Sequence, residues 1–152
     1  MNRSPRVFVD TCVLFAAVLC ESGGARLILS LGEMNVVQLW MGPQVLLEAD
    51  RVLERKAPES KARFALLLDQ ARIQIVAQPG EGMLAQARAV TTHGSDTRVL
   101  SEALAAAVEY FVTLDRQHFL HSPHATSLLF PMGTPGDFLA WMRKRMQPAG
   151  PR

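Results

Sequence analysis

The sequence predicts an α/β fold in which helices cover both faces of a mostly parallel sheet. Short runs of β-branched and aromatic residues alternate with stretches of helical length, and this alternation is typical of parallel sheets. The chain has 152 residues, of which 49% are hydrophobic and 20% charged, a composition typical of globular proteins. We find no internal repeat, linker or low-complexity segment, so we expect one domain over residues 1–152, with residues 147–152 as a frayed tail.

The first half of the chain is expected to contain two strands and three helices. Residues 6–10 and 35–39 are short runs rich in β-branched or aromatic residues that favour strands. Between them, residues 11–20 are apolar and long enough for a helix, a glycine pair breaks this stretch, and a shorter helix follows at 25–31. Pro43 suits the first turn of a helix that runs to about Lys56.

The second half continues the alternation. A helix that begins at Pro58 has apolar residues at i, i+3, i+4 and i+7, and residues 72–76 alternate like a strand. A weaker helix at 82–92 precedes a strong one from Asp96 to Val108, for which Ser95 is the predicted N-cap. The remaining expected elements are strands at 109–114 and 127–130 and a helix from Pro135 to about Met146 that Thr134 caps.

The cysteines and the hydropathy pattern bear on the compartment. Cys12 and Cys20 lie eight residues apart on one expected helix, which separates them by roughly 12 Å, too far for a disulfide. Two free thiols suit a reducing compartment, and no apolar run reaches the ~20 residues of a transmembrane helix. We therefore expect a cytoplasmic protein without a membrane partner. The net charge of +2 permits contact with a polyanion but does not require it.

Four carboxylates occupy positions where acids are uncommon. Asp10 and Asp115 each follow a predicted strand, and ligands bind at the carboxyl ends of parallel strands. Asp96 falls near the middle of the apolar face of its helix, and Glu48 lies along the edge of another apolar face. By contrast, Asp50, Glu54 and Glu102 are expected to point outward.

These four acids predict a metal site when they are taken together. Singly, each has a simpler interpretation, as a helix cap, a residue favoured by the helix dipole, or the partner of a nearby arginine. Clustered carboxylates repel one another, and a set of oxygen ligands favours Mg²⁺ or Mn²⁺. We expect Asp10 and Asp96 to be the main ligands, with Glu48 and Asp115 completing the shell or orienting water.

The same positions carry a resemblance to PIN-domain nucleases. Val9-Asp10-Thr11-Cys12-Val13-Leu14 resembles the first motif of that family, and Gln44-Val-Leu-Leu-Glu48 resembles the second. Ser95-Asp96 with its following apolar residues is similar to the third motif, and Tyr110 to Asp115 to the fourth. Thr134-Pro135-Gly136-Asp137-Phe138-Leu139 is similar to the C-terminal segment of VapC-like toxins of bacterial toxin–antitoxin pairs. The resemblance spans residues 6 to about 142.

The resemblance implies a PIN-like three-layer α/β/α sandwich and a Mg²⁺- or Mn²⁺-dependent endoribonuclease. It also implies an RNA substrate, a cognate antitoxin and a homodimer. The family's acidic positions correspond to Asp10, Glu48, Asp96 and Asp115. The residue two places after the first acid is commonly Asn in this family, whereas Cys12 stands here, and a thiol is a weaker hydrogen-bond partner.

Other functions remain open from the sequence. A phosphotransferase of the haloacid-dehalogenase type would need a second acid where Cys12 stands, which argues against it. A non-catalytic RNA-binding PIN protein would be expected to lack one of the acids, and none is missing. A PIN nuclease that processes RNA without being a toxin is not distinguished from a toxin. The spacing of His118, His121 and His124 could indicate a separate metal site, although Pro123 interrupts any helix that would align them.

Overall fold

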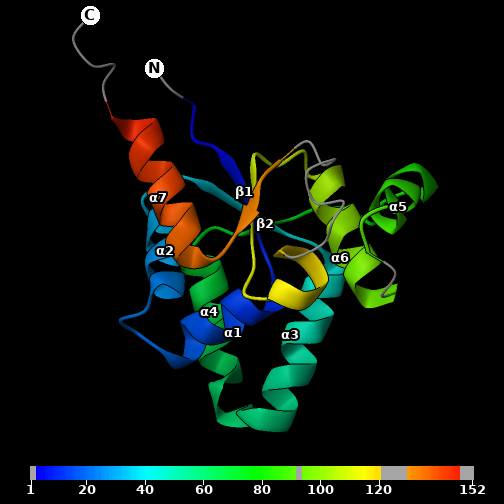
Figure 1. The fold of residues 1–152 in the computed structure, drawn as a ribbon. Helices are drawn as coiled ribbons and strands as arrows, with labels where there is room; N and C mark the ends of the chain where they lie inside the picture. The colour runs from blue at the N-terminus through cyan, green and yellow to red at the C-terminus, as the bar shows by residue number, and fades with distance from the viewer. Residues whose placement is uncertain (1–2, 92–93, 121–129, 148–152) are drawn as a thin grey trace, which may run out of the picture.

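A five-stranded sheet forms the centre of the molecule, with the strands in the order β3-β2-β1-β4-β5 (Figure 1). Every strand pairing is parallel. The computed structural model describes residues 3–91, 94–120 and 130–147. The predicted α/β/α fold is confirmed, and its sheet is parallel throughout.

The central strand β1 (Arg6–Val9) lies between β2 (Gln38–Met41) and β4 (Tyr110–Val112). The side chains of Val7, Phe8 and Val9 are fully buried, as expected for a parallel strand that is covered on both faces. Phe8 pairs with Phe111 in register, and their rings stack with centroids 5.3 Å apart. Since the three strands are parallel, their carboxyl ends lie at one edge of the sheet.

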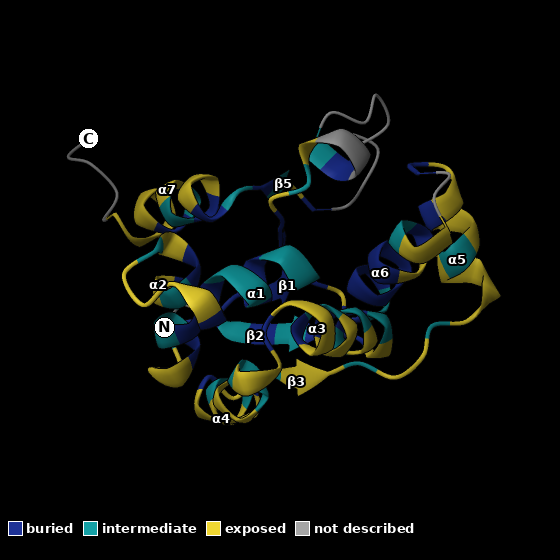
Figure 2. Ribbon diagram, turned by 90° about the horizontal axis from the view of Figure 1, so that it is seen from below, coloured by how far each residue is buried: buried dark blue, intermediate teal, exposed yellow. Residues whose placement is uncertain are grey.

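Helices connect the strands and cover the sheet. In chain order the remaining elements are α1 (Thr11–Leu19), α2 (Gly24–Glu33), α3 (Pro43–Lys56), the short 3-10 helix η1 (Pro58–Ser60), α4 (Lys61–Gln70), β3 (Gln74–Ile75), α5 (Glu81–Arg88), α6 (Gly94–Ala105), the π-helical turn η2 (Arg116–Leu120), β5 (Met132–Gly133) and α7 (Pro135–Met146). Figures 1 and 2 show α2 and α7 on one side of the sheet and α5 and α6 on the other. Helices α1 and α3 lie below the sheet in Figure 1, at the edge where β1 and β2 end.

Several element boundaries differ from the sequence prediction. The second strand begins at Gln38 rather than at Asn35, because Asn35 has a φ of 58° and forms the left-handed turn that follows α2. Helix α6 begins at Gly94, so Ser95 lies in its first turn and is not its N-cap. The predicted strand at 127–130 falls largely on residues outside the described part of the chain, as does the tail at 148–152.

The cysteines and the longest apolar helices can now be compared with the sequence prediction. Cys12 and Cys20 are both free thiols, the first half-buried and the second exposed. Within the described residues, no single helix is long and apolar enough to cross a membrane, whereas α1 and α2 together meet that test by length and composition but are bent by 96°.

Candidate active site

Asp10 stands where the central strand β1 ends and α1 begins. As the N-cap of α1, its Oδ1 accepts a hydrogen bond of 2.8 Å from the backbone N–H of Thr11. Its Oδ2 accepts a bond of 2.7 Å from the hydroxyl of Thr113, which follows β4, and lies 3.5 Å from the Cys12 thiol. The carboxylate is therefore held by two adjacent strand ends, and the residue is only 6% exposed.

Thr113 connects the ends of β1 and β4. Its side chain is fully buried. Its Oγ1 donates to Asp10 and accepts a 3.0 Å bond from the backbone N–H of Asp115. The hydroxyl therefore holds Asp10 directly and fixes the backbone from which the Asp115 side chain extends.

Glu48 reaches the same edge from the second turn of α3. One carboxylate oxygen accepts a 3.1 Å bond from the Thr11 hydroxyl, and the other accepts a 2.9 Å bond from the Gln44 amide one turn earlier. Thr11 thus joins Asp10 to Glu48 through its backbone and its side chain. In the structure the hydroxyls of Thr11 and Thr113 both donate to carboxylates of the cleft.

All four predicted acids line one open cleft of about 430 Å³. Asp96 enters it from the first turn of α6, and Asp115 from the segment after β4. The remaining lining residues are Thr11, Cys12, Phe15, Val52, Lys56 and Leu114. Among the described residues, no three acidic, histidine or cysteine side chains already form a compact metal-binding group. The catalytic and metal-binding roles of the four acids therefore stay predictions.

Burial controls the electrostatics of the cleft. Desolvation raises the pKa of Asp10 to about 6, against the hydrogen bonds from Thr113, Thr11 and Cys12, and the negative charge of Glu48 raises it further. The site at neutral pH thus holds a buried carboxylate beside a second acid. A divalent cation would neutralise this charge, and the oxygen donors of the cleft fit Mg²⁺ or Mn²⁺.

Cys12 occupies the position at which the family commonly has Asn. Its Sγ accepts a 3.2 Å bond from the backbone N–H of Leu114 and lies 3.7 Å from the Thr113 hydroxyl. Burial and the charge of Asp10 raise the pKa of this thiol to about 12, so it remains protonated at neutral pH. A protonated thiol can hold the loop after β4 and contact Asp10, but it is not the thiolate that acts as a strong metal ligand or nucleophile.

Two residues near the site, Lys56 and Glu102, were not predicted from the sequence to lie there. Lys56 lies at the cleft with its Nζ 5.9 Å from the centre of the Phe15 ring. Glu102, expected to point outward, is instead buried. Nothing in the sequence marked Lys56 as a residue of the cleft, because the end of a helix is a usual place for basic residues. The position of Glu102 between the apolar residues Leu100 and Leu104 was a weak indication in the sequence that its side chain is buried. The triplet His118, His121 and His124 remains untested, since the last two residues and the side chain of the first lie outside the described part of the chain.

Comparison with known families shows to which family the chain belongs. The model of a family described as PIN domain matches residues 6–117, a range that contains all four acids of the cleft. The chain belongs to the PIN domain family, a family of nucleases. Comparison with curated proteins gives no match.

Solved structures show the same fold. A chain of the VapBC2 complex from Rickettsia felis, solved on a DNA fragment from its promoter, superposes with a TM-score of 0.65 at 16% identity. The match covers 84% of this chain and 98% of that one. PAE2754 from Pyrobaculum aerophilum gives a TM-score of 0.57 at 12% identity, over 95% of this chain and 94% of that one. At these identities the likeness establishes the fold, and it agrees with the resemblance to VapC-like proteins noted in the sequence.

Proposed function

We propose that this chain is a Mg²⁺- or Mn²⁺-dependent endoribonuclease and the toxin of a bacterial toxin–antitoxin pair. The observation that carries the proposal is the gathering of Asp10, Glu48, Asp96 and Asp115 in one cleft at the carboxyl edge of the sheet. Each acid comes from a different element, so the shared cleft is a product of the fold and not of local sequence. The PIN family membership supports nuclease chemistry at this position.

Phosphodiester hydrolysis needs an activated water and compensation of the negative charge on the phosphate. Divalent ions supply both when bound, because they lower the pKa of coordinated water and neutralise phosphate oxygens. Asp10 and Asp96 would hold the cation, the first from a rigid position fixed by Thr113 and the Thr11 N–H. Glu48 is fixed through both oxygens and would orient the attacking water or complete the ligand set.

The rim of the cleft supports a nucleic-acid substrate. The Lys56 ammonium lies at the cleft, where it would approach a phosphate next to the one that is cut. Phe15, Val52 and Leu114 add apolar surface beside it, and Leu114 is 43% exposed. A charged rim beside apolar surface suits an RNA strand that presents both phosphates and bases.

The VapC-like resemblance and the fold neighbour from the VapBC2 complex support the proposed toxin role. It implies an antitoxin partner, a cytoplasmic site of action and a homodimer. Expression of the chain alone should arrest bacterial growth, and co-expression of a protein encoded by the adjacent reading frame should relieve the arrest. Growth arrest that persists in an Asp10→Asn variant would contradict the toxin mechanism, and cleavage of RNA without any growth effect would favour a processing nuclease.

The activity is tested by incubating purified protein with total RNA in Mn²⁺, in Mg²⁺ and in excess EDTA. We expect defined fragments with either metal and intact RNA with EDTA. Cleavage of equal extent in EDTA, by a preparation free of contaminating nuclease, would overturn the metal-dependent mechanism.

A further inference from the structure

Helix α3, which carries Glu48, lacks a cap of its own. Its N-cap is Gly42, which has no side chain to accept a hydrogen bond, and Pro43 at the first helical position has no N–H. The first backbone donors that need a partner are therefore those of Gln44 and Val45. In most helices a Ser, Thr, Asp or Asn at the N-cap accepts from these positions.

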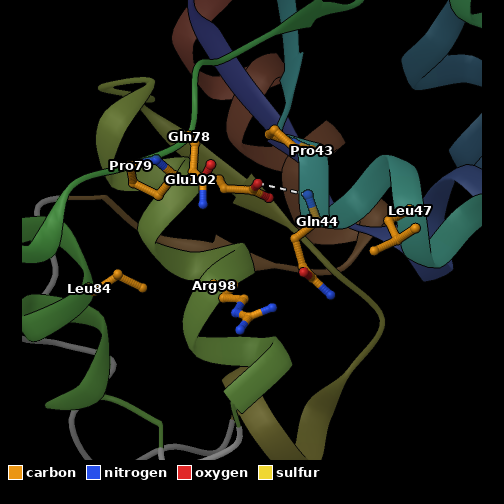
Figure 3. Close-up of a pocket in the computed structure, with 8 residues that line it drawn as sticks. All are labelled: Pro43, Gln44, Leu47, Gln78, Pro79, Leu84, Arg98 and Glu102. Atoms are coloured by element: carbon orange, nitrogen blue, oxygen red, sulfur yellow. Dashed lines mark hydrogen bonds between the residues drawn. The ribbon is translucent and has the colours of Figure 1, made fainter.

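Glu102 of α6 supplies the missing acceptor from another helix. Its Oε2 accepts a 2.8 Å hydrogen bond from the Gln44 N–H, drawn as the dashed line in Figure 3. A Cβ on Gly42 would overlap this carboxylate, so only glycine leaves room for it. The negatively charged carboxylate of Glu102 lies at the N-terminus of α3, which is the positive end of the helix dipole, and this arrangement is favourable.

The contact joins two of the four acids. Helix α6 carries Asp96 six residues before Glu102, and α3 carries Glu48 four residues after Gln44. The Gln44 side-chain amide donates to Glu48 Oε1 at 2.9 Å. A continuous path therefore runs from Glu102, through the backbone and side chain of Gln44, to the Glu48 carboxylate.

Simple capping does not explain this arrangement. Glu102 is 2% exposed, and its Oε1 is buried without a hydrogen-bond partner among the described residues. Burying a carboxylate with one oxygen unpaired is unfavourable, and a serine at position 42 would cap the helix without that cost. What the serine would not do is fix α3 against α6.

We propose that Glu102 is a positioning residue that sets the placement of Glu48 relative to Asp96, and thereby the affinity of the cleft for a divalent cation. The inference rests on the proposed function, because it assigns these two acids to one metal site. Residues that orient metal ligands from outside the ligand set change metal affinity by about 10- to 100-fold when they are removed. The loss should therefore appear in the binding of Mn²⁺ itself, before any RNA is added.

The test separates capping from positioning by restoring the cap alone. In Glu102→Ala, the melting temperature without metal should fall by about 5 °C, and the Kd for Mn²⁺ should rise at least about tenfold. The double variant Gly42→Ser/Glu102→Ala regains a local cap, since removal of the carboxylate makes room for the serine. We expect its melting temperature to recover to within about 2 °C of the wild type while its Mn²⁺ affinity stays about tenfold weaker. Wild-type Mn²⁺ affinity in this folded double variant would overturn the proposal and leave Glu102 as a cap.

A second variant tests the path if the double variant fails to fold. Gln44→Ala keeps the backbone bond to Glu102 and introduces a strong helix former, so its melting temperature should stay near that of the wild type. Its Kd for Mn²⁺ should rise several-fold, because Glu48 loses the amide that orients it. Unchanged Mn²⁺ affinity in Gln44→Ala would show that Glu102 does not act on Glu48 through Gln44, and would overturn the proposal. A wild-type protein that binds Mn²⁺ but leaves RNA intact would refute only the proposed activity, whereas one that binds no Mn²⁺ would refute both.

Discussion

Thr113 shows how one buried hydroxyl organises the site at the scale of single residues. It donates to Asp10, the most buried of the four acids in the cleft, and accepts from the backbone of Asp115. Two carboxylates on neighbouring strand ends thus depend on one side chain that carries no charge. Its position beside the fourth acidic motif could be seen in the sequence, but its partner, 103 residues away along the chain, could not.

Thr113→Val should weaken metal binding without unfolding the protein. Valine fills nearly the same volume but leaves Asp10 without its hydroxyl donor, so we expect the Kd for Mn²⁺ and the cleavage rate to worsen by about 10- to 100-fold. Titration of each variant with Mn²⁺ measures the effect. Thr113→Ser keeps the hydroxyl and should stay within a few-fold of the wild type. Equal losses in the valine and serine variants would point to packing rather than to the hydrogen bond.

At the scale of elements, the contact between α3 and α6 is made by a buried titratable group, the Glu102 carboxylate. Burial raises the pKa of Glu102 to about 7, against the backbone N–H groups of Gln44 and Val45, and the charge of Glu48 raises it further. Arg98 on the same helix faces the adjoining pocket in Figure 3. Because the folded pKa lies above the ordinary value of 4.5, Glu102 favours the folded state below pH 4.5, and this contribution is lost as the pH rises through 7.

Glu102→Gln should remove that pH dependence, since glutamine does not titrate. Measured in EDTA by urea unfolding, the stability of the wild type relative to the variant should fall between about pH 4.5 and pH 7 and stay level beyond. The change should be at most about 3.5 kcal/mol, because each pKa unit corresponds to about 1.4 kcal/mol. Asp10 titrates in both proteins, so its effect cancels in the difference. A constant difference across this range would show that Glu102 titrates normally in the folded protein.

The elements also show where sequence reasoning succeeds. The helix from Pro43 to Lys56 and the helix from Pro135 that Thr134 caps match the prediction, because both carry local signals at their first residues. The strand β2 begins later than predicted because Asn35 and Val36 form the left-handed turn that closes α2, with backbone bonds to Gly32 and Leu31. Glu102 was assigned to the wrong side of α6 because its partner, the bare N-terminus of α3, is visible only in three dimensions.

At the scale of the whole molecule, parallel strands bring distant acids to one edge. Asp10 and Asp115 follow β1 and β4, which pair directly, while α3 and α6 deliver Glu48 and Asp96 to the same cleft. The order of the motifs along the chain predicted this convergence through the general rule for strand ends. The pairing of Thr11 with Glu48, by contrast, depends on the packing of α1 against α3 and had no signal in the sequence.

Metal should stabilise the whole fold if the cleft binds it. A ligand that binds only the native state stabilises it by about 2.7 kcal/mol at a hundredfold excess over its Kd, which for a chain of this size raises the melting temperature by about 5 to 10 °C. Differential scanning fluorimetry with Mn²⁺, and with Ca²⁺ for comparison, measures this shift. Asp96→Asn should melt above the wild type without metal, since it removes one charge from a repelling group, and should lose most of the shift. A wild-type melting temperature that does not respond to Mn²⁺ or Mg²⁺ would count against the site.

The most direct test of the four-acid site is the rate of RNA cleavage by Asp10→Asn in Mn²⁺, with Glu54→Gln as the matched control. Asparagine keeps the size and capping ability of Asp10 but removes the anionic ligand, a loss worth several kcal/mol of barrier and therefore a rate about a thousandfold lower. Glu54 lies exposed on the outer face of α3, paired with Lys61, so its glutamine variant makes the same charge change away from the cleft and should cut at nearly the wild-type rate. Cleavage by folded Asp10→Asn at the wild-type rate would contradict the central claim.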